Sequence, residues 1–315
     1  MKIAIIGSGH VGMAVFRGLQ DLSGVQEIVL CGRDAKSPKM LAEIEDYLDA
    51  QVLRVAVPVK LSCGGYDKTA GADIIIFCAG TTPALNQTRL DLVKDNVAVV
   101  NAVFGEINKY NREAIIICLS NPVDIITAAV RAITGRSRLK VIGTGTLLDT
   151  ARMRKKISAL LDLAPTEINM FVLGEHGNSS CPIWSSLRIL GLTLDEYMAE
   201  ETGTVTQVKT AKLTDIMRYT GKFIHAGKGH TAYGVAESAC RIVSAIINDT
   251  HEFFPLSVVC EGEYDIDGFA TSVPCLIGRE GILAIKNIRM QADEKAMFDQ
   301  SAAILRKIAQ DTGLV

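Results

Sequence analysis

One histidine of this sequence has the type and setting needed for proton transfer. His176 lies between two glycines in the segment 174–177 (GEHG), directly after the apolar stretch 171–173. A histidine at the end of a buried strand can face a cavity and change its charge near neutral pH. It could equally be a loop histidine that makes only a structural hydrogen bond. The tetrapeptide alone does not separate these two interpretations.

A second chemical candidate is the segment 146–152 (TLLDTAR), in which Asp149 and Arg152 are three residues apart. At the start of a helix this spacing puts both side chains on one face. An aspartate bonded to a histidine fixes its tautomer, and an arginine can bind a carboxylate through two hydrogen bonds. Alternatively, Thr146 and Asp149 form a capping box that only stabilises the helix N-terminus. In the first interpretation, the acid, the arginine and His176 form one proton-transfer and anion-binding set.

Composition bounds the class of protein that carries these residues. The chain has 315 residues, is 48% apolar and 22% charged, and has a net charge of −2, which indicates a soluble globular protein large enough for two domains. The interspersed charges argue against a nucleic-acid surface or a polybasic membrane patch. No apolar run reaches the roughly 20 residues of a membrane span, and no signal peptide precedes the first strand. The eight scattered cysteines form no CxxC pair, so we expect a cytoplasmic protein without a metal site.

The glycine-rich segment 7–12 (GSGHVG) lies between an apolar strand at 2–6 and a helical stretch that ends near residue 22. In this context the glycines allow a tight turn and a close approach of backbone N–H groups to a diphosphate. The segment therefore predicts dinucleotide binding, with His10 as a bystander. The candidate cofactor-binding residues here are Gly7, Gly9, Val11 and Gly12.

The end of the second strand, 27–31, departs from the usual pattern for NAD. An acidic residue about twenty residues after the glycines normally binds the ribose 2′-hydroxyl, but this chain has Gly32 and Arg33 there. A lost carboxylate and a gained cation favour a 2′-phosphate, so we predict that NADP is accepted beside NAD, with Arg33 as a contact and Ser37 as a second candidate. Two alternatives remain: Asp34 binds the ribose from a shifted position, or NAD binds without an acid.

Alternating apolar strands and helices predict an α/β fold. In the first half, near-continuous apolar strands indicate a doubly wound parallel sheet covered on both faces, a Rossmann domain over residues 1–144. The expected strands also include 73–78, 114–119 and 139–142, and the expected helices 89–110 and 123–133. The second half, 145–315, predicts an α+β catalytic domain. Its expected helices are 148–162, 205–226, 231–248 and 292–310, and its expected strands 167–174, 254–263, 266–277 and 282–286.

Three features of these elements bear on the site. The polar loop 81–89 follows a strand at the edge where such folds bind ligands, so it is a candidate lid that carries Arg89. Asn121 follows the next strand and is expected to present its amide to the cofactor or the substrate. In the last helix, Met297, Ile304 and Ile308 predict a buried stripe.

Five motifs together resemble the lactate/malate dehydrogenase family, and most closely its L-lactate and L-2-hydroxyisocaproate dehydrogenase branch. The resemblance covers essentially the whole chain. It implies an N-terminal Rossmann domain, a C-terminal α+β catalytic domain, and hydride transfer between a nicotinamide cofactor and a monocarboxylic 2-keto or 2-hydroxy acid. The motifs are GSGHVG at 7–12, TRLDL at 88–92, SNPVD at 120–124, GTGTLLDTAR at 143–152 and GEHGN at 174–178.

The resemblance also implies roles for single residues. His176 resembles the proton donor and acceptor, Asp149 its orienting partner, Arg152 the residue that binds the substrate carboxylate, and Arg89 the lid arginine that polarises the reacting carbonyl. Asn121 is similar to the active-site asparagine, in a cis bond to Pro122. Thr231 resembles a wall of the substrate pocket, and Val235 an apolar residue behind the nicotinamide.

The chain departs from the family pattern at two places. The lid position that selects between lactate and malate is Pro83, which brings no charge, so we expect oxaloacetate to be a poor substrate and monocarboxylic 2-keto acids, including larger apolar ones, to be preferred. At the sugar-bisphosphate site of some bacterial relatives, Arg154 matches the family arginine but Ser186 replaces the histidine, which argues against that regulation. The resemblance implies a homodimer or a homotetramer.

Three other functions remain as alternatives: a malate dehydrogenase, an NAD-dependent glycosidase of the same architecture, and an inactive dinucleotide sensor. The intact DTAR and GEHG motifs and the absence of a Cys/His metal pattern argue against the glycosidase. An inactive sensor is disfavoured because all four residues expected to take part in the reaction are present: His176, Asp149, Arg152 and Arg89.

Overall fold

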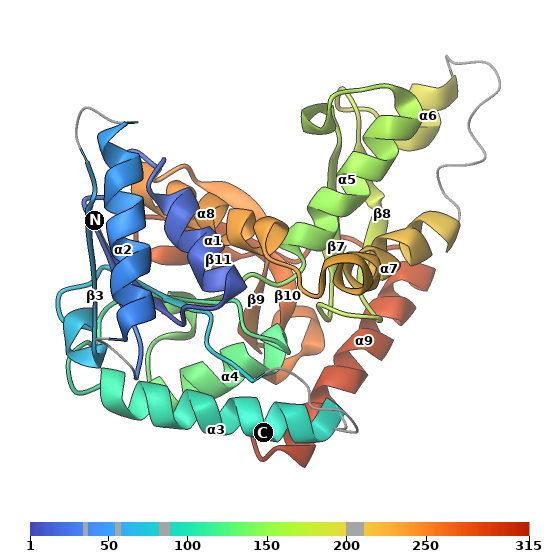
Figure 1. The fold of residues 1–315 in the computed structure, drawn as a ribbon. Coiled ribbons are helices and arrows are strands. Elements are labelled where there is room, and N and C mark those ends of the chain that lie inside the picture. Colours follow the sequence, from blue (N-terminus) through green and yellow to red (C-terminus); the bar gives the residue numbers. More distant parts are fainter. Residues whose placement is uncertain (34–36, 54–57, 82–88, 200–210, 315) are drawn as a thin grey trace.

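The structure is a computed structural model that describes residues 1–33, 37–53, 58–81, 89–199 and 211–314. In the first half, strands and helices alternate along the chain (Figure 1). These elements are β1 (Lys2–Ile6), α1 (His10–Leu19), β2 (Glu27–Cys31), α2 (Pro38–Val52), β3 (Lys60–Gly64), β4 (Ile74–Phe77), α3 (Arg89–Ile107), β5 (Ile115–Cys118), α4 (Val123–Thr134) and β6 (Val141–Gly143).

The second half begins with a helix and contains a two-stranded sheet and three further strands. Its elements are α5 (Leu147–Leu161), β7 (Asn169–Leu173), β8 (Cys181–Arg188), α6 (Leu194–Ala199), α7 (Ala211–Lys228), α8 (Tyr233–Asn248), β9 (Glu252–Glu261), β10 (Asp267–Gly278), β11 (Gly281–Ile285) and α9 (Ala292–Asp311). Among the described residues, no helix combines the length and the hydrophobicity needed to cross a bilayer.

Six parallel strands form the first part of a large sheet, in the order β3-β2-β1-β4-β5-β6. This is the doubly wound order of dinucleotide-binding domains, and the strand order reverses between β1 and β4. The α/β fold class predicted from the sequence is therefore confirmed. The sheet then continues into the second half, because β9 pairs with β6 at Gly143 and Ser257 and carries β10 and β11 beside it in antiparallel order.

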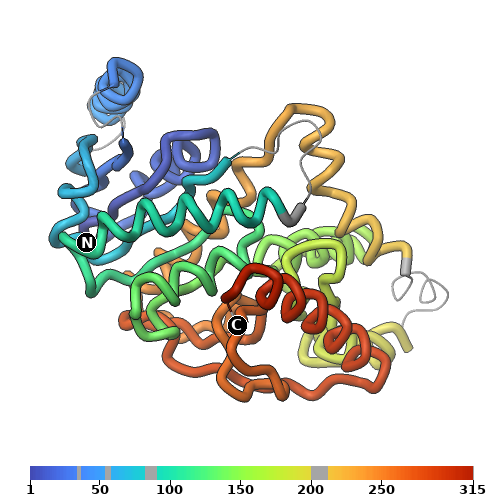
Figure 2. Tube along the Cα trace, turned by 90° about the horizontal axis from the view of Figure 1, so that it is seen from below, coloured from blue at the N-terminus to red at the C-terminus, as the bar shows by residue number. Residues whose placement is uncertain are grey.

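Alternate residues of the parallel strands face opposite layers of helices. Ile3 and Ile5 belong to the core on one face of the sheet, with α1 and α8, whereas Ala4 and Ile6 belong to the core on the other face, with α3 and α4. Figure 1 shows these two layers above and below the sheet. Figure 2, seen from below, places α3 (teal) and the C-terminal helix α9 (red) nearest the viewer.

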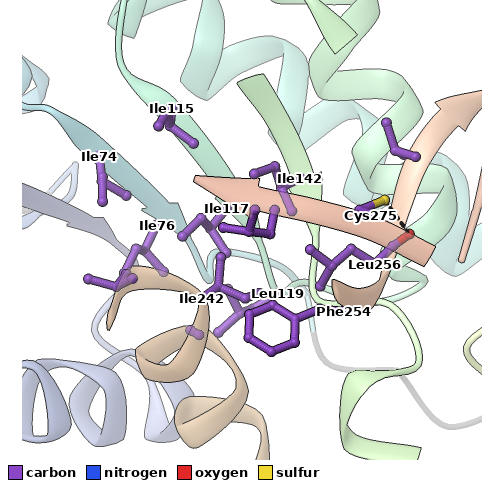
Figure 3. Close-up of a cluster of buried hydrophobic side chains, with 14 of the residues drawn as sticks. Ile74, Ile76, Ile115, Ile117, Leu119, Ile142, Ile242, Phe254, Leu256 and Cys275 are labelled. Atoms are coloured by element: carbon purple, nitrogen blue, oxygen red, sulfur yellow. Dashed lines mark hydrogen bonds between the residues drawn. The ribbon is translucent and has the colours of Figure 1, made fainter. Parts of the chain in front are cut away.

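One core cluster spans both halves of the chain. Buried isoleucines of β4 and β5, such as Ile76 and Ile117, lie in the same cluster as Phe254 and Leu256 of β9 and Ile242 of α8 (Figure 3). The two halves therefore share this cluster, and each also has a buried cluster of its own, around β4, α3 and α4 in the first half and around α5, β7 and β8 in the second.

A glycine makes this junction sterically feasible. Gly145, in the turn between β6 and α5, has φ +50°, and a Cβ there would lie 2.5 Å from the backbone nitrogen of Ser257 and 2.6 Å from Oγ of Ser272. Only a residue without a side chain lets β9 and β10 approach this turn so closely. The turn leads directly into the helix that carries Asp149.

The structure corrects one prediction about the core. In α9, Met297 and Ile304 are 38% and 36% exposed, whereas Phe298 and Leu305 are buried. Ile308 is partly buried against the core, but the predicted stripe was wrong for Met297 and Ile304, because the buried face lies one position further along the helix. The elements α2, β3, β8 and α6 were not predicted. The expected helix at 205–226 begins among residues 200–210, which lie outside the described part of the chain.

Candidate active site

His176 leaves the end of β7 on a short loop and meets an acid from the start of α5. Gly174, which precedes it, has φ +86° and forms an isolated antiparallel bridge with Ser272 of β10. This turn directs the imidazole so that its Nδ1 lies 2.6 Å from Oδ2 of Asp149. The expected proximity of His176 and Asp149 is therefore present in the structure.

Arg152 completes this group from the next turn of α5. Its guanidinium donates a hydrogen bond of 3.0 Å to Oδ1 of Asp149, so the two oxygens of that carboxylate hold His176 and Arg152 side by side. The side chains of Arg152 and His176 remain 15% and 22% exposed, whereas that of Asp149 is 7% exposed. The acid is thus enclosed by its two partners, which both retain access to a ligand.

The alternative interpretation of Asp149 as one half of a capping box is wrong. The backbone amide of Thr146, which a capping box would bond to the acid, donates instead to Oγ of Ser272 at 3.1 Å. The hydroxyl of Thr146 donates to the carbonyl oxygen of Val172 and forms no cap. Asp149 is therefore free to interact with His176.

The three groups shift one another's protonation. Burial alone would raise the pKa of Asp149, but the charges of His176 and Arg152 and their hydrogen bonds hold it below its usual value. Burial alone would lower the pKa of His176, but the charge and the hydrogen bond of Asp149 outweigh burial and raise it. An ionised carboxylate beside an imidazolium is the expected state of a histidine that donates a proton near neutral pH.

These residues line a cavity of about 430 Å³. Its wall also includes Asn121, Thr231 and Val235, three residues that the sequence placed near the substrate or the nicotinamide. The bond between Asn121 and Pro122 is cis, as the resemblance implied. The carbonyl oxygen of Asn121 accepts a hydrogen bond of 2.8 Å from Nδ2 of Asn96 in α3, which fixes this corner of the cavity.

Sequence reasoning missed a set of basic side chains that line the cavity beside Arg152. Arg218, Lys222 and His225 of α7 line it together with Arg152. Their spacing of four and three residues puts them on one face of a helix, and that spacing is the signal that could have found them. Asn96 was also missed, because only the fold brings its amide to the backbone of Asn121.

The glycine-rich loop has the shape of a diphosphate cradle. Gly7 has φ +112°, and a Cβ on Gly12 would lie 1.9 Å from the carbonyl oxygen of Gly7, so this turn requires both glycines. A Cβ on Gly9 would meet no atom within 4 Å, which leaves open space beside the N-terminus of α1. Val11 in the first turn of α1 is partly buried against the core. The chain therefore fits a dinucleotide at this position.

Family models of known proteins match nearly the whole chain. Residues 1–143 match the lactate/malate dehydrogenase NAD binding domain, and residues 146–313 match the lactate/malate dehydrogenase alpha/beta C-terminal domain. The chain belongs to the lactate/malate dehydrogenase family. This membership confirms the predicted resemblance, and it favours a dehydrogenase over the NAD-dependent glycosidase.

Individual members of the lactate/malate dehydrogenase family align with the chain from end to end. It is 35% identical over 314 residues to an L-lactate dehydrogenase of Moorella thermoacetica, covering 99% of this chain and 98% of the relative. It is 34% identical over 308 residues to an L-lactate dehydrogenase of Acetivibrio thermocellus, covering 98% and 96%. The crystal structure of a minor L-lactate dehydrogenase from Enterococcus mundtii superimposes with a TM-score of 0.93 at 32% identity, covering 98% of each chain.

Several of the predicted site residues lie partly or wholly outside the described part of the chain. Arg89 is the first residue of α3, but its side chain lies outside the described part, as does all of Pro83. Arg33 is exposed in the turn after β2, whereas Asp34 lies outside the described residues. In the described part of the chain, no cluster of three or more His, Cys, Asp or Glu side chains could hold a metal ion.

The two positions that correspond to an effector site in some members of the family bind backbone of this chain. The guanidinium of Arg154 donates two hydrogen bonds, of 3.1 and 3.0 Å, to the carbonyl oxygen of Pro165. The hydroxyl of Ser186 donates to the carbonyl oxygen of Ile183 and accepts from the amide of Phe171. Both side chains therefore have structural partners.

Proposed function

We propose that this protein is an NAD-dependent L-2-hydroxy-acid dehydrogenase of the L-lactate dehydrogenase type, which interconverts monocarboxylic 2-oxo and 2-hydroxy acids. The observation that carries this proposal is the joint placement of His176 and Arg152 on one carboxylate, that of Asp149, at the wall of a cavity. A proton donor and an anion-binding cation side by side suit a substrate whose carboxylate is adjacent to its reacting carbonyl.

His176 moves the proton in this mechanism. Because Asp149 holds Nδ1, the ring nitrogen left for the substrate is Nε2. In the reductive direction Nε2 gives its proton to the substrate oxygen, and in the oxidative direction it removes the hydroxyl proton. Asp149 stabilises the imidazolium and fixes the tautomer, while Arg152 binds the substrate carboxylate through its guanidinium.

The cofactor side of the site fits NAD(H). When bound, NADH supplies the hydride that reduces C2 of the substrate. Gly7 and Gly12 shape the turn that receives the diphosphate, and the space beside Gly9 admits it. Asn121 and Val235 both line the cavity that contains His176. They are proposed to hold the nicotinamide and the substrate together. Enclosure of the reactants excludes water and provides the proximity that hydride transfer needs.

The roles of three further residues are assigned from their resemblance to the family. We assign to Arg89 the polarisation of the reacting carbonyl, and to Thr231 the wall of the substrate pocket. Pro83 has no charge to balance a second carboxylate, so oxaloacetate is expected to be a poor substrate. The rival function, a malate dehydrogenase, requires the opposite preference.

Acceptance of NADPH is a further part of the proposal. It is supported by the exposed Arg33 in the turn after β2 and by Gly32 in place of the usual acid. A 2′-phosphate would be attracted to this guanidinium, whereas position 32 offers the 2′-hydroxyl of NADH no carboxylate.

We also propose that the chain forms a homo-oligomer, as a dimer or a tetramer. Large apolar side chains are exposed on α7 and α8, where Tyr219, Phe223 and Tyr233 are 65%, 71% and 72% exposed. Exposed aromatic side chains of this kind are typical of a surface that another chain covers. Light scattering coupled to size-exclusion chromatography measures the mass directly, and a monomer would contradict this part.

A matrix of two cofactors and three 2-oxo acids tests the proposed function. NADH and NADPH are each combined with pyruvate, 2-oxo-4-methylpentanoate and oxaloacetate, and oxidation of the cofactor is followed by absorbance. We expect turnover with both monocarboxylic acids and little with oxaloacetate. Oxaloacetate as the best substrate would support the malate dehydrogenase instead, and no turnover with any acid would support the inactive sensor. A strong preference for NADH over NADPH would reject the role of Arg33.

A further inference from the structure

The loop that carries His176 is anchored at successive backbone positions by different elements. Gly174 exchanges two backbone hydrogen bonds with Ser272 of β10, at 3.0 and 3.1 Å. The amide of Glu175 donates to Oγ of Ser301 in α9 at 2.8 Å. Both of these anchors are uncharged, and both come from the second half of the chain.

The third anchor is a buried acid from the first half. The backbone amide of His176 donates a hydrogen bond of 2.9 Å to Oδ2 of Asp124, in the first turn of α4. The other oxygen, Oδ1, accepts a hydrogen bond of 2.6 Å from the hydroxyl of Ser257 in β9. Asp124 is 1% exposed, so its carboxylate has been removed from water to make these two contacts. Isolated burial of a carboxylate is unfavourable, and an apolar residue would avoid its cost.

The charge of this carboxylate reaches the imidazole. Asp124 is one of the groups that raise the pKa of His176, after Asp149. Burial raises the pKa of Asp124 itself to about 6, against the hydrogen bonds from Ser257 and His176 that lower it. The other titratable groups that face Asp124 are Glu175, on the loop that carries His176, and the thiol of Cys260 on β9.

We propose that Asp124 is a positioning residue for the reaction: its ionised carboxylate fixes the backbone of His176 and sustains the positive charge of the imidazolium. Asp124 does not touch the substrate. It acts through His176 and, because it lies three residues after Asn121, it also joins the cofactor side of the cavity to the catalytic loop. This inference rests on the proposed function, in which His176 donates the proton.

The proposal predicts a conflict between stability and catalysis at this position. The pKa of Asp124 in the folded chain lies above that of an exposed aspartate, so its contribution to stability is present at acid pH and is lost as the pH rises through about 6. At pH 7.5 the ionised acid therefore destabilises the fold. Removal of its charge should leave the melting temperature unchanged or higher while it impairs the enzyme.

Asp124→Asn is the first test variant. Its amide oxygen can accept from the amide of His176, and its NH₂ group can donate to the hydroxyl of Ser257, so the shape is kept and only the charge is lost. We expect the pKa of His176 to fall by about half a unit to one unit, which corresponds to a three- to tenfold change in its proton affinity. The alkaline limb of kcat/KM for pyruvate reduction should fall to lower pH by the same amount.

The pKa of His176 is measured directly by NMR on protein whose five histidines are labelled with ¹³C. The signal of His176 is identified by its loss in His176→Gln. Because this titration needs no substrate, it tests the role of Asp124 even if pyruvate turns out to be a wrong substrate. The matrix of substrates tests the proposed function separately.

Two further variants complete the test. Ser257→Ala removes one donor to Asp124 and should shift the pKa of His176 in the same direction by a smaller amount, so it serves if Asp124→Asn fails to fold. Ser301→Ala removes a neutral anchor of the same loop and should leave the pKa of His176 unchanged. A pKa of His176 that is unaltered in the Asp124 and Ser257 variants would overturn the proposal, as would a Ser301 variant with an equal shift.

Discussion

His176 and Asp149 support each other's charge, and this determines how the activity should depend on pH. The pKa of His176 is raised, so the imidazolium persists to higher pH than in a free histidine. Reduction of a 2-oxo acid needs this protonated form, and its kcat/KM should therefore fall as the pH rises through the raised pKa. Initial rates between about pH 5 and pH 9 measure this limb. In Asp149→Asn the limb should move to lower pH, and an unmoved limb would show that the acid does not act on His176.

Loss of the imidazole should affect the chemical step and leave cofactor binding intact. Positioned acid catalysis contributes roughly 100-fold to 10,000-fold, so His176→Ala is expected to lower kcat by about that factor. Its affinity for NADH, measured by fluorescence titration, should match that of the wild type, because the residues of the glycine-rich loop do not line the cavity that contains His176. A variant with full turnover would remove His176 from the mechanism.

At the residue scale, the sequence was sufficient for the groups that are close in a motif. Asp149 and Arg152 are one helical turn apart, and a helix start predicts their common face. The anchors of the loop were not predictable in this way. Asp124 is 52 residues from His176, and Ser301 is 126 residues from Glu175, so only the tertiary structure brings them together.

At the scale of elements, the turn between β1 and α1 allows a matched pair of substitutions. A Cβ at Gly12 would lie 1.9 Å from the carbonyl oxygen of Gly7, so Gly12→Ala must displace α1 and should destabilise the fold by about 1–3 kcal/mol. Gly9 has an extended backbone and free space, so Gly9→Ala should keep the wild-type melting temperature and weaken NADH binding, because its methyl group occupies the diphosphate path.

Thermal unfolding and NADH titration of both variants check this prediction. If Gly9→Ala bound NADH as tightly as the wild type, the diphosphate would not pass over Gly9. If Gly12→Ala melted at the wild-type temperature, the close contact would be relieved without displacement of α1.

Prediction of elements succeeded where one type of periodicity dominates. The isoleucine-rich strands β4 and β5 are buried on both faces, and their continuous apolar runs predicted a parallel sheet covered on both faces. In α9 the buried face includes Glu294, which accepts hydrogen bonds from Ser185 and Gln291, and an apolar pattern cannot indicate a buried acid. The stripe was therefore assigned to the wrong side of that helix.

At the scale of the whole molecule, the distribution of charge matters more than its sum. The chain has a net charge of −2, yet three cations, Arg152, Arg218 and Lys222, line the cavity beside the acid Asp149. Such a local cluster attracts an anionic substrate and raises its association rate, and added salt weakens this attraction. Lys222→Gln should therefore lower kcat/KM for pyruvate by about two- to fivefold at low ionic strength and by less at high salt.

The matched control for this prediction is Lys307→Gln, since Lys307 is an exposed lysine of α9 that does not line the cavity. It changes the net charge equally and should leave kcat/KM unaltered. An equal loss in both variants would mean that the overall charge, and not the cavity wall, attracts the substrate. The measurement is a series of initial rates at increasing concentrations of potassium chloride.

The pairing of β6 with β9 at Gly143 and Ser257 has a mechanical consequence. It joins the strands of both halves of the chain into one continuous β-sheet. A rotation of one half against the other would break this strand pairing and expose the core cluster that both halves share. We therefore expect calorimetry to record one endothermic peak for the whole chain. Two resolved peaks would instead show that the two halves unfold one after the other, and would contradict this expectation.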